Sequence, residues 1–176
     1  ARAWLKVCMP SDRDAWIDWL RRRPLALSVH GWLGVHAGVV PQWDRETTLR
    51  LAAEVEATSA RRLSGRLRFA HYPLDKRLAQ FEFDFQPSID RSVIAELSTL
   101  RFVEEHRNAL FLGPPGVGKS HLAIALGIAA TEAGYRTYFT TAADLVGALS
   151  AAHLEGSWTS KMRTYTGPSV LVIDEL

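Results

Sequence analysis

The sequence has 176 residues, with 21 basic and 19 acidic side chains and a formal net charge of +2 at pH 7. This balance excludes a strong overall field that would by itself dictate a nucleic-acid or membrane partner. The single cysteine, Cys8, excludes an internal disulfide and fits a reducing compartment. No apolar run reaches the length of a membrane span and no signal-peptide layout is present, so we expect a cytoplasmic protein without a membrane partner.

The first sixty residues predict a small α+β fragment. Ser11 and Asp14 form a capping-box pair at the start of a short amphipathic helix. Apolar runs at 25–29 and 32–36 flank His30-Gly31, which is typical of a tight hairpin. Residues 44–60 have the apolar spacing of a further helix.

The next segment, 61–88, is basic and then aromatic. Six positive residues fall within 17 positions, namely Arg61, Arg62, Arg66, Arg68, Lys76 and Arg77. Such a run could contact DNA phosphates, although composition alone favours a solvated linker. Phenylalanines alternate with polar residues in Phe81–Pro87, and these rings could pack against the following domain. We therefore interpret 61–88 as a linker.

Residues 89–176 show an alternation of helices and strands. We expect helices over 89–105, 119–133, 141–151 and 153–165, and strands over 109–112, 136–140 and 169–173. Thr141 and Asp144 form a capping box, and Gly134 is a suitable helix stop. This order predicts the α/β class, with a parallel sheet, flanking helices and right-handed crossovers.

A phosphate-binding loop connects the first of these strands to its helix. The sequence G-x-x-x-x-G-K-[ST] is matched by Gly113, Pro114, Pro115, Gly116, Val117, Gly118, Lys119 and Ser120, with His121 next. The glycines let successive backbone N–H groups turn toward a polyphosphate. Lys119 is placed to bind the β- and γ-phosphates and Ser120 to ligate Mg²⁺. The predicted fold is thus a P-loop NTPase.

Two acids, Asp174 and Glu175, follow the last apolar strand. A carboxylate at that strand end can reach the Mg²⁺ held by Ser120, usually through water, and the next acid can orient or deprotonate an attacking water. Asp174 is therefore a candidate metal ligand, and Glu175 with Lys119 a candidate catalytic pair. The alternative is two exposed acids after a core strand.

Two stretches near the start resemble one enzyme family. Ser11–Pro24 and Gly34–Asp44 are similar to the middle of the symmetrical diadenosine tetraphosphatases, which are metallophosphoesterases. The resemblance implies a metal-ligand position for His36. The family's other metal-binding motifs are absent from this sequence, and one histidine cannot hold two metals. An ordinary histidine at a strand end is therefore the favoured interpretation of His36.

The chain from about Arg61 onward resembles a different family. Five segments carry the resemblance: 83–90, 97–104, 111–126, 140–145 and 170–176. They are similar to the IstB-like proteins, which are AAA+ helper ATPases of insertion-sequence transposition. That family is related to the DnaC-type helicase loaders. The resemblance implies ATP and Mg²⁺ as cofactors, with 113–120 as Walker A and Asp174-Glu175 as Walker B. It also implies double-stranded DNA and a transposase as partners, and a possible homo-oligomer.

Departures from the IstB-like pattern limit these expectations. The family's helical N-terminal domain is replaced by the tetraphosphatase-like piece, and the polar sensor, arginine finger and lid that would follow Leu176 are absent from the sequence. The chain opens on Ala1 rather than Met. We expect a fragment whose P-loop sheet is truncated after the Walker B strand, with nucleotide binding but weak or absent hydrolysis.

The expected organisation is a metallophosphoesterase-like fragment over 1–60, a linker over 61–88 and the first half of an ATPase core over 89–176. Joining of two unrelated enzymes near residue 60 suggests a hybrid reading frame. Three alternatives to a transposition helper stay open: a helicase-loader ATPase, a dinucleoside tetraphosphate hydrolase and a non-functional hybrid.

Overall fold

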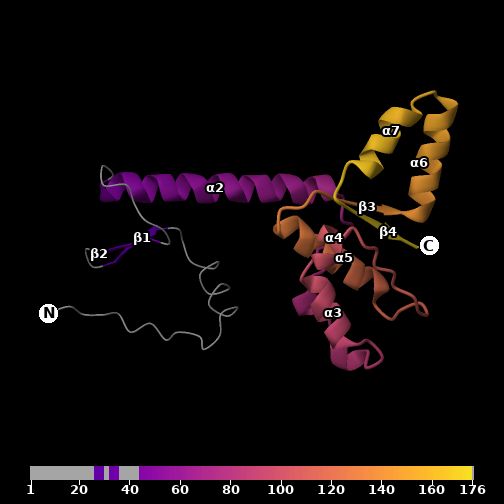
Figure 1. Ribbon diagram of the computed structural model, residues 1–176, viewed down its shortest axis with the longest axis horizontal. Coiled ribbons are helices and arrows are strands. Elements are labelled where there is room, and N and C mark those ends of the chain that lie inside the picture. Colours follow the sequence, from indigo (N-terminus) through magenta and orange to yellow (C-terminus); the bar gives the residue numbers. More distant parts are fainter. Residues whose placement is uncertain (1–25, 30–31, 36–43, 176) are drawn as a thin grey trace. The chain divides into compact units, whose positions relative to one another are not determined.

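The computed structural model describes residues 26–29, 32–35 and 44–175, and the chain divides into two units, Ala1–Arg61 and Arg62–Leu176 (Figure 1). The helix expected at Ser11 and the candidate ligand His36 lie outside the described residues. No helix in the described part is both long and apolar enough to cross a membrane.

The described part of the first unit contains a hairpin and the beginning of a long helix. Strands β1 (Ala26–Val29) and β2 (Trp32–Val35) pair antiparallel, with Val29 opposite Trp32, which confirms the expected hairpin. Helix α2 (Arg45–Ala70) follows and is capped by Asp44, whose Oδ1 accepts a hydrogen bond of 2.7 Å from the backbone N–H of Thr47. This bond lowers the pKa of the Asp44 carboxyl, because it stabilises the charged form.

The helix expected over 44–60 is longer than predicted, because α2 continues to Ala70, through the first ten residues of the segment interpreted as a linker. Arginine and leucine are good helix formers, so a run of positive charge does not end a helix by itself. The decisive contribution is burial: Ala70 is fully buried and Leu67 packs against the core of the second unit. His71, with φ of 57°, then ends the helix.

The core of the second unit lies between one helix and a parallel pair of strands. Helix α5 (Lys119–Glu132) packs on β3 (Thr137–Thr141) and β4 (Val170–Asp174). The strands run parallel with Thr137 opposite Val170 and Thr141 opposite Asp174, as the alternation of elements predicted. The buried cluster at the centre consists of Ile124, Ile128, Phe139 and Val172.

Helices lie against both faces of this sheet. Adjacent residues of a strand point to opposite faces: Phe139 joins the cluster with α5, whereas the ring of Tyr138 lies 5.7 Å from that of Tyr165. Tyr165 belongs to α7 (Trp158–Thr166), which pairs with α6 (Ala142–Leu154) on the side of β3 and β4 away from α5 (Figure 1). This is the arrangement expected of an α/β fold.

A buried hydroxyl network ties the segment after α2 to α5 and β3. The Tyr72 hydroxyl donates to Thr137 Oγ1 at 2.8 Å and lies 3.2 Å from Thr131 Oγ1. Thr131 and Thr137 are almost completely buried. A Cβ on Gly127 would come within 2.6 Å of the tyrosine oxygen, so only glycine leaves room for it.

The single helix expected over 89–105 is wrong, because the structure has two: α3 (Arg91–Ser98) and α4 (Arg101–Glu104). The side chains of Ser98 and Thr99 each donate to a backbone carbonyl three residues earlier, which competes with continued helix formation. Leu100 then adopts a left-handed conformation with φ of 63° and is buried. Burial of one leucine thus outweighs the helical periodicity.

The strand expected over 109–112 is also wrong. These residues form no strand and pair with neither β3 nor β4, and Leu110 and Leu112 are 67% and 83% exposed. A strand exists through hydrogen bonds to a neighbour, and the described part of the chain provides none here. The apolar composition of 109–112 was therefore not enough to form a strand.

Smaller segments complete the second unit. Two 3₁₀ turns, η1 (Leu78–Gln80) and η2 (Phe83–Phe85), lie in the segment before α3, and η2 falls within the alternating aromatic residues 81–87. The capping box at Thr141 is confirmed, since its Oγ1 accepts from the Asp144 N–H at 3.1 Å. Helix α6 runs past Ala151 to Leu154, and the helix expected from 153 begins only at Trp158, because Gly156 takes φ of 72° between them.

Candidate functional site

The loop from Gly113 to Gly118 adopts the backbone geometry of a phosphate cradle. Gly116 and Gly118 have φ of 81° and 90°, a region that residues with a Cβ rarely enter. Space around Gly116 is open, whereas a Cβ on Gly118 would lie 2.6 Å from the Phe81 ring. The first glycine is thus needed for its conformation and the second for conformation and close packing.

Helix α5 starts where the loop ends, with Gly118 as its N-cap. The first N–H to bond back is that of Leu122, which donates to Gly118 O at 3.0 Å. The N–H groups of Lys119, Ser120 and His121 precede it and point out of the helix end, as N-terminal N–H groups do. Together with the helix dipole they form an anion-binding terminus.

Lys119 spans the loop. Its Nζ donates hydrogen bonds to the carbonyl oxygens of Gly113 and Pro114, both at 2.9 Å. The loop residues 113–116 are themselves exposed to solvent. The lysine therefore fixes the first two residues of the loop to the start of α5. A polyphosphate in the cradle would compete with these carbonyls for the same ammonium group.

Ser120 and Asp174, 54 residues apart in sequence, meet at the carboxyl end of the sheet. The Ser120 hydroxyl donates to Asp174 Oδ1 at 3.0 Å. A hydroxyl and a carboxylate at this separation are the hard oxygen donors that Mg²⁺ takes beside water and phosphate oxygens, so they fit the ion that the loop implies. No group of three or more histidine, cysteine or acidic residues suited to a metal occurs within the described ranges.

Glu175 follows Asp174 directly and is exposed. Its φ of 58° places a non-glycine residue in the left-handed region, which is uncommon and costs free energy. The sequence placed Glu175 beside Asp174 as a catalytic candidate, and the structure adds this strained backbone. Its catalytic role stays a prediction.

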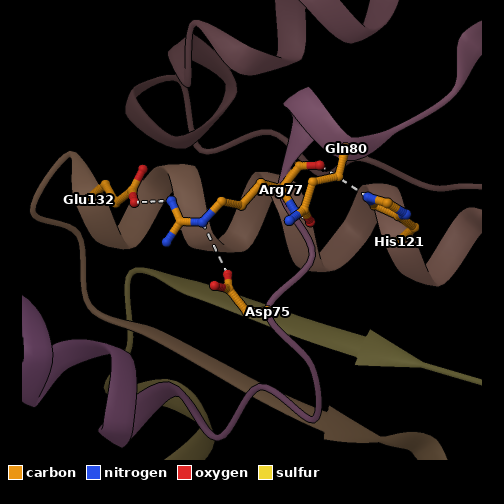
Figure 2. A network of polar contacts seen from close by, with 5 residues as sticks. All are labelled: Asp75, Arg77, Gln80, His121 and Glu132. Carbon is orange, nitrogen blue, oxygen red and sulfur yellow. Dashed lines mark hydrogen bonds and ion pairs between the residues drawn. The ribbon is translucent and has the colours of Figure 1, made fainter.

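A brace that the sequence did not predict holds the segment before the site against α5 (Figure 2). The Arg77 guanidinium contacts Glu132 at 2.5 Å and Asp75 at 3.1 Å, and its backbone carbonyl lies 3.0 Å from His121 Nε2. Gln80 accepts the Arg77 backbone N–H through Oε1 at 2.9 Å. The hydrogen bond that the Arg77 guanidinium donates to Glu132 raises the pKa of Arg77, because it stabilises the charged form. One residue thus contacts both ends of α5.

An aromatic contact extends this brace to the loop. The Phe81 ring lies 5.2 Å from that of His121 and 4.8 Å from that of Phe83, both near edge-to-face. Packing of Phe81 against the following domain, expected from the alternating aromatics, is confirmed, but Phe85 is 77% exposed. The sequence analysis treated Arg77 as one of a run of positive residues. Its partner Glu132 is 55 residues away, so the local sequence does not indicate the pair.

Of the predicted site residues, Lys119 contacts Gly113 and Pro114, and Ser120 contacts Asp174, which Glu175 follows in the chain. His121 lies at the same helix end but points to Arg77 and Phe81. A glycine loop that leads into a helix N-terminus, with an acid from a parallel strand on the loop serine, defines a P-loop nucleotide-binding protein.

The family follows from comparison with known proteins. The family described as "IstB-like ATP binding protein" matches residues 42–176, and the chain belongs to it. An ATP-binding protein of insertion sequence IS5376 from Geobacillus stearothermophilus is 45% identical over 126 residues, 72% of this chain and 50% of the relative. A corresponding protein of IS21 from Pseudomonas aeruginosa is 42% identical over 128 residues, 73% of this chain and 48% of the relative. The chain thus spans about half the length of these relatives.

A second similarity is confined to a short stretch. The symmetrical bis(5'-nucleosyl)-tetraphosphatase of Janthinobacterium sp. (strain Marseille) is 59% identical over 51 residues, which is 29% of this chain and 19% of that enzyme. Both resemblances drawn from the sequence are therefore confirmed. The IstB-like match begins at residue 42, ahead of the start expected near Arg61, so it includes all of α2.

Proposed function

We propose that this chain binds ATP with Mg²⁺ at the loop 113–120 and serves as an ATP-binding component in the transposition of an insertion sequence. The observation that carries the nucleotide site is the contact of Ser120 with Asp174 at 3.0 Å, at the N-terminus of α5. It puts the two oxygen ligands expected for Mg²⁺ beside a helix end whose N–H groups suit phosphates. When bound, the ion would neutralise charge on the β- and γ-phosphates.

The residues of the site divide the remaining work. Lys119 would leave the Gly113 and Pro114 carbonyls and bind the terminal phosphates, and the N–H groups at the start of α5 would hold the phosphate nearest the helix. Glu175 would orient the attacking water and accept its proton.

A hollow beside the loop suits the nucleoside. It has a volume of about 520 Å³ and is lined by Phe81–Phe85 and Arg91. The hollow is open to solvent, and its aromatic side chains would offer a face on which a base could stack. Since Phe81 also contacts Gly118, a base in the hollow would lie next to the phosphates.

Hydrolysis is expected to be slow. No hydrogen bond or ion pair joins an arginine of residues 50–175 to the loop or to Glu175. Lys119 is then the one cation of the described site, and an arginine finger is worth on the order of a thousandfold or more in such reactions. Turnover would require an arginine from outside the described residues.

The transposition role rests on the relatives, several of which are named as ATP-binding proteins of insertion sequences. Double-stranded DNA and a transposase are the partners this role requires. A helicase-loader role would use the same site with a different partner, so co-purification with a transposase or with a replicative helicase separates the two.

The test is Mg²⁺-dependent binding of a fluorescent ATP analogue to the whole chain. We expect micromolar binding that Lys119→Ala weakens at least tenfold, while Lys161→Ala on α7 serves as a matched control with little effect. Ser120→Ala should remove most of the Mg²⁺ dependence. Failure of the folded native chain to bind, or equal loss in the control, would refute the proposal.

A further inference from the structure

The side chain of His121, the residue after the loop serine, is directed at Arg77 and Phe81. Its Nε2 lies 3.0 Å from the backbone carbonyl oxygen of Arg77 (Figure 2), and its ring lies 5.2 Å from the Phe81 ring at an interplanar angle of 86°. A carbonyl oxygen can only accept, so Nε2 is the donor. A neutral imidazole has one N–H, and the Arg77 carbonyl takes it. The His121 side chain is therefore engaged with the segment before α3.

Phe81 connects this contact to the rest of the site. A Cβ on Gly118 would lie 2.6 Å from the Phe81 ring, so the ring lies against the backbone where the loop ends and α5 begins. Phe81 also lines the hollow beside the loop. One aromatic ring thus contacts the phosphate loop and forms part of the wall of the hollow, and His121 contacts that ring from α5.

The Arg77 carbonyl is the second point at which His121 holds this segment. The same carbonyl accepts from the Gln80 N–H at 3.0 Å, which closes the turn η1 that leads to Phe81. The donation from His121 fixes this turn relative to the start of α5. The ion pair of Arg77 with Glu132 does not do so, because Glu132 lies at the other end of the helix.

Packing of the core does not account for this arrangement. The core of the second unit uses other residues of α5, namely Ile124 and Ile128, whereas His121 is only half-buried. Its two contacts instead join the loop end of α5 to the segment that begins the wall of the hollow. A movement of Phe81 would therefore affect the backbone at Gly118 and the hollow together.

We propose that His121 is a positioning residue for nucleotide binding, which holds Phe81 against Gly118 and so couples the hollow to the phosphate loop. The inference rests on the proposed function, in which the hollow receives the nucleoside. His121 acts through Phe81 and the Arg77 carbonyl rather than through its own contact with the ligand. Coupling is a free energy between two sites. It therefore acts on a ligand that fills both the hollow and the loop, and not on one that fills the loop alone.

The experiment compares Mg²⁺-ATP with Mg²⁺-tripolyphosphate, which has three phosphates and no nucleoside, as competitors of the fluorescent ATP analogue on the whole chain. His121→Ala should weaken ATP binding about tenfold, since it removes one hydrogen bond and one aromatic contact. Tripolyphosphate affinity should change by less than about twofold, because the hollow does not contribute to it. A folding defect would lower both affinities equally, so the ratio of the two affinities is the readout.

A matched control and two partial replacements accompany this variant. His153→Ala removes a comparable edge-to-face contact, with Trp158, and should leave the ratio unchanged. His121→Gln keeps an N–H for the Arg77 carbonyl, and His121→Phe keeps a ring for Phe81, so each should recover part of the ATP affinity. Phe81→Leu should also weaken ATP binding, and adding His121→Ala to it should then have little further effect, because the two residues act as one unit.

The outcomes separate this inference from the proposed function. Loss of ATP affinity at retained tripolyphosphate affinity, with partial recovery in His121→Gln or His121→Phe, supports the positioning role. An unchanged ratio in His121→Ala, an equal change in the His153→Ala control, or full additivity with Phe81→Leu overturns that role while the nucleotide site stands. A folded native chain that binds neither competitor overturns the proposed function and this inference with it.

Discussion

The residues on the two sides of the phosphate loop are held very differently. On the α5 side the helix is buried along much of its length, and its end contacts β4 through Ser120 and the brace through His121. On the other side, 109–112 are unpaired, with Leu110 and Leu112 largely exposed. The cradle is therefore positioned from its helical side, and the Lys119 side chain connects Gly113 and Pro114 to that side.

The largest expected difference comes from the same substitution, leucine to alanine, made on each side of the loop. Leu126 on α5 is 4% exposed and Leu112 is 83% exposed. Leu126→Ala should lower the free energy of unfolding by about 2–5 kcal/mol, because it leaves a cavity. Leu112→Ala should change it by less than about 0.5 kcal/mol. Urea denaturation measures both, and similar values for the two variants would show that 109–112 is packed in solution.

The next effect concerns the loop glycines. Gly118→Ala combines a left-handed φ with a 2.6 Å approach to Phe81, and should cost about 1–3 kcal/mol together with most ATP-analogue binding. Gly116→Ala has the same conformational strain in open space and should cost less. Thermal unfolding and analogue titration compare them. If Phe81→Ala does not recover part of the Gly118→Ala loss, the packing explanation is wrong.

A smaller effect is expected in the hydroxyl network that supports α5. Tyr72→Phe should cost about 1–2 kcal/mol, since it removes a buried hydrogen bond to Thr137. Burial raises the pKa of Tyr72 above its ordinary 10.0, so the unfolded chain loses this proton first as pH rises. Stability should therefore be full below pH 10 and fall above it. The fall should be shallower in Tyr72→Phe, as urea midpoints between pH 8 and 11 would show; an unchanged slope would contradict the burial of this hydroxyl.

The smallest effect should come from the brace. Arg77→Met removes ion pairs to Glu132 and Asp75 whose side chains are 41–69% exposed, and exposed pairs contribute about 0–1 kcal/mol. We expect a destabilisation below about 1 kcal/mol and a loss of ATP-analogue affinity of a few-fold. Arg101→Met, which breaks an exposed pair with Glu105, is the control. Equal ATP-analogue affinity in the two variants would show that the brace does not support nucleotide binding by the loop.

The sequence predicted those features that depend on local chemistry. The glycine loop, the capped helices and the β3–β4 pairing followed from residue type and spacing, and the juxtaposition of Ser120 with Asp174 followed from strand order. Prediction from the sequence failed where contacts with residues distant in the chain determine the local structure. Leu67 and Ala70 extend α2 because a core is there to receive them. Leu100 interrupts a helix for the same reason, and 109–112 has the composition of a strand without a neighbour in the described chain.

The backbone of Glu175 has an evolutionary consequence. A residue with φ of 58° is strained by about 1–3 kcal/mol unless it is glycine, for which this conformation is ordinary. A codon change to glycine would raise stability and delete the carboxylate in one step. If Glu175 has the proposed role, selection for a stable fold and selection for an acid after β4 would act in opposite directions at this position. A lineage that keeps the glutamate accepts a less stable protein in return for the carboxylate.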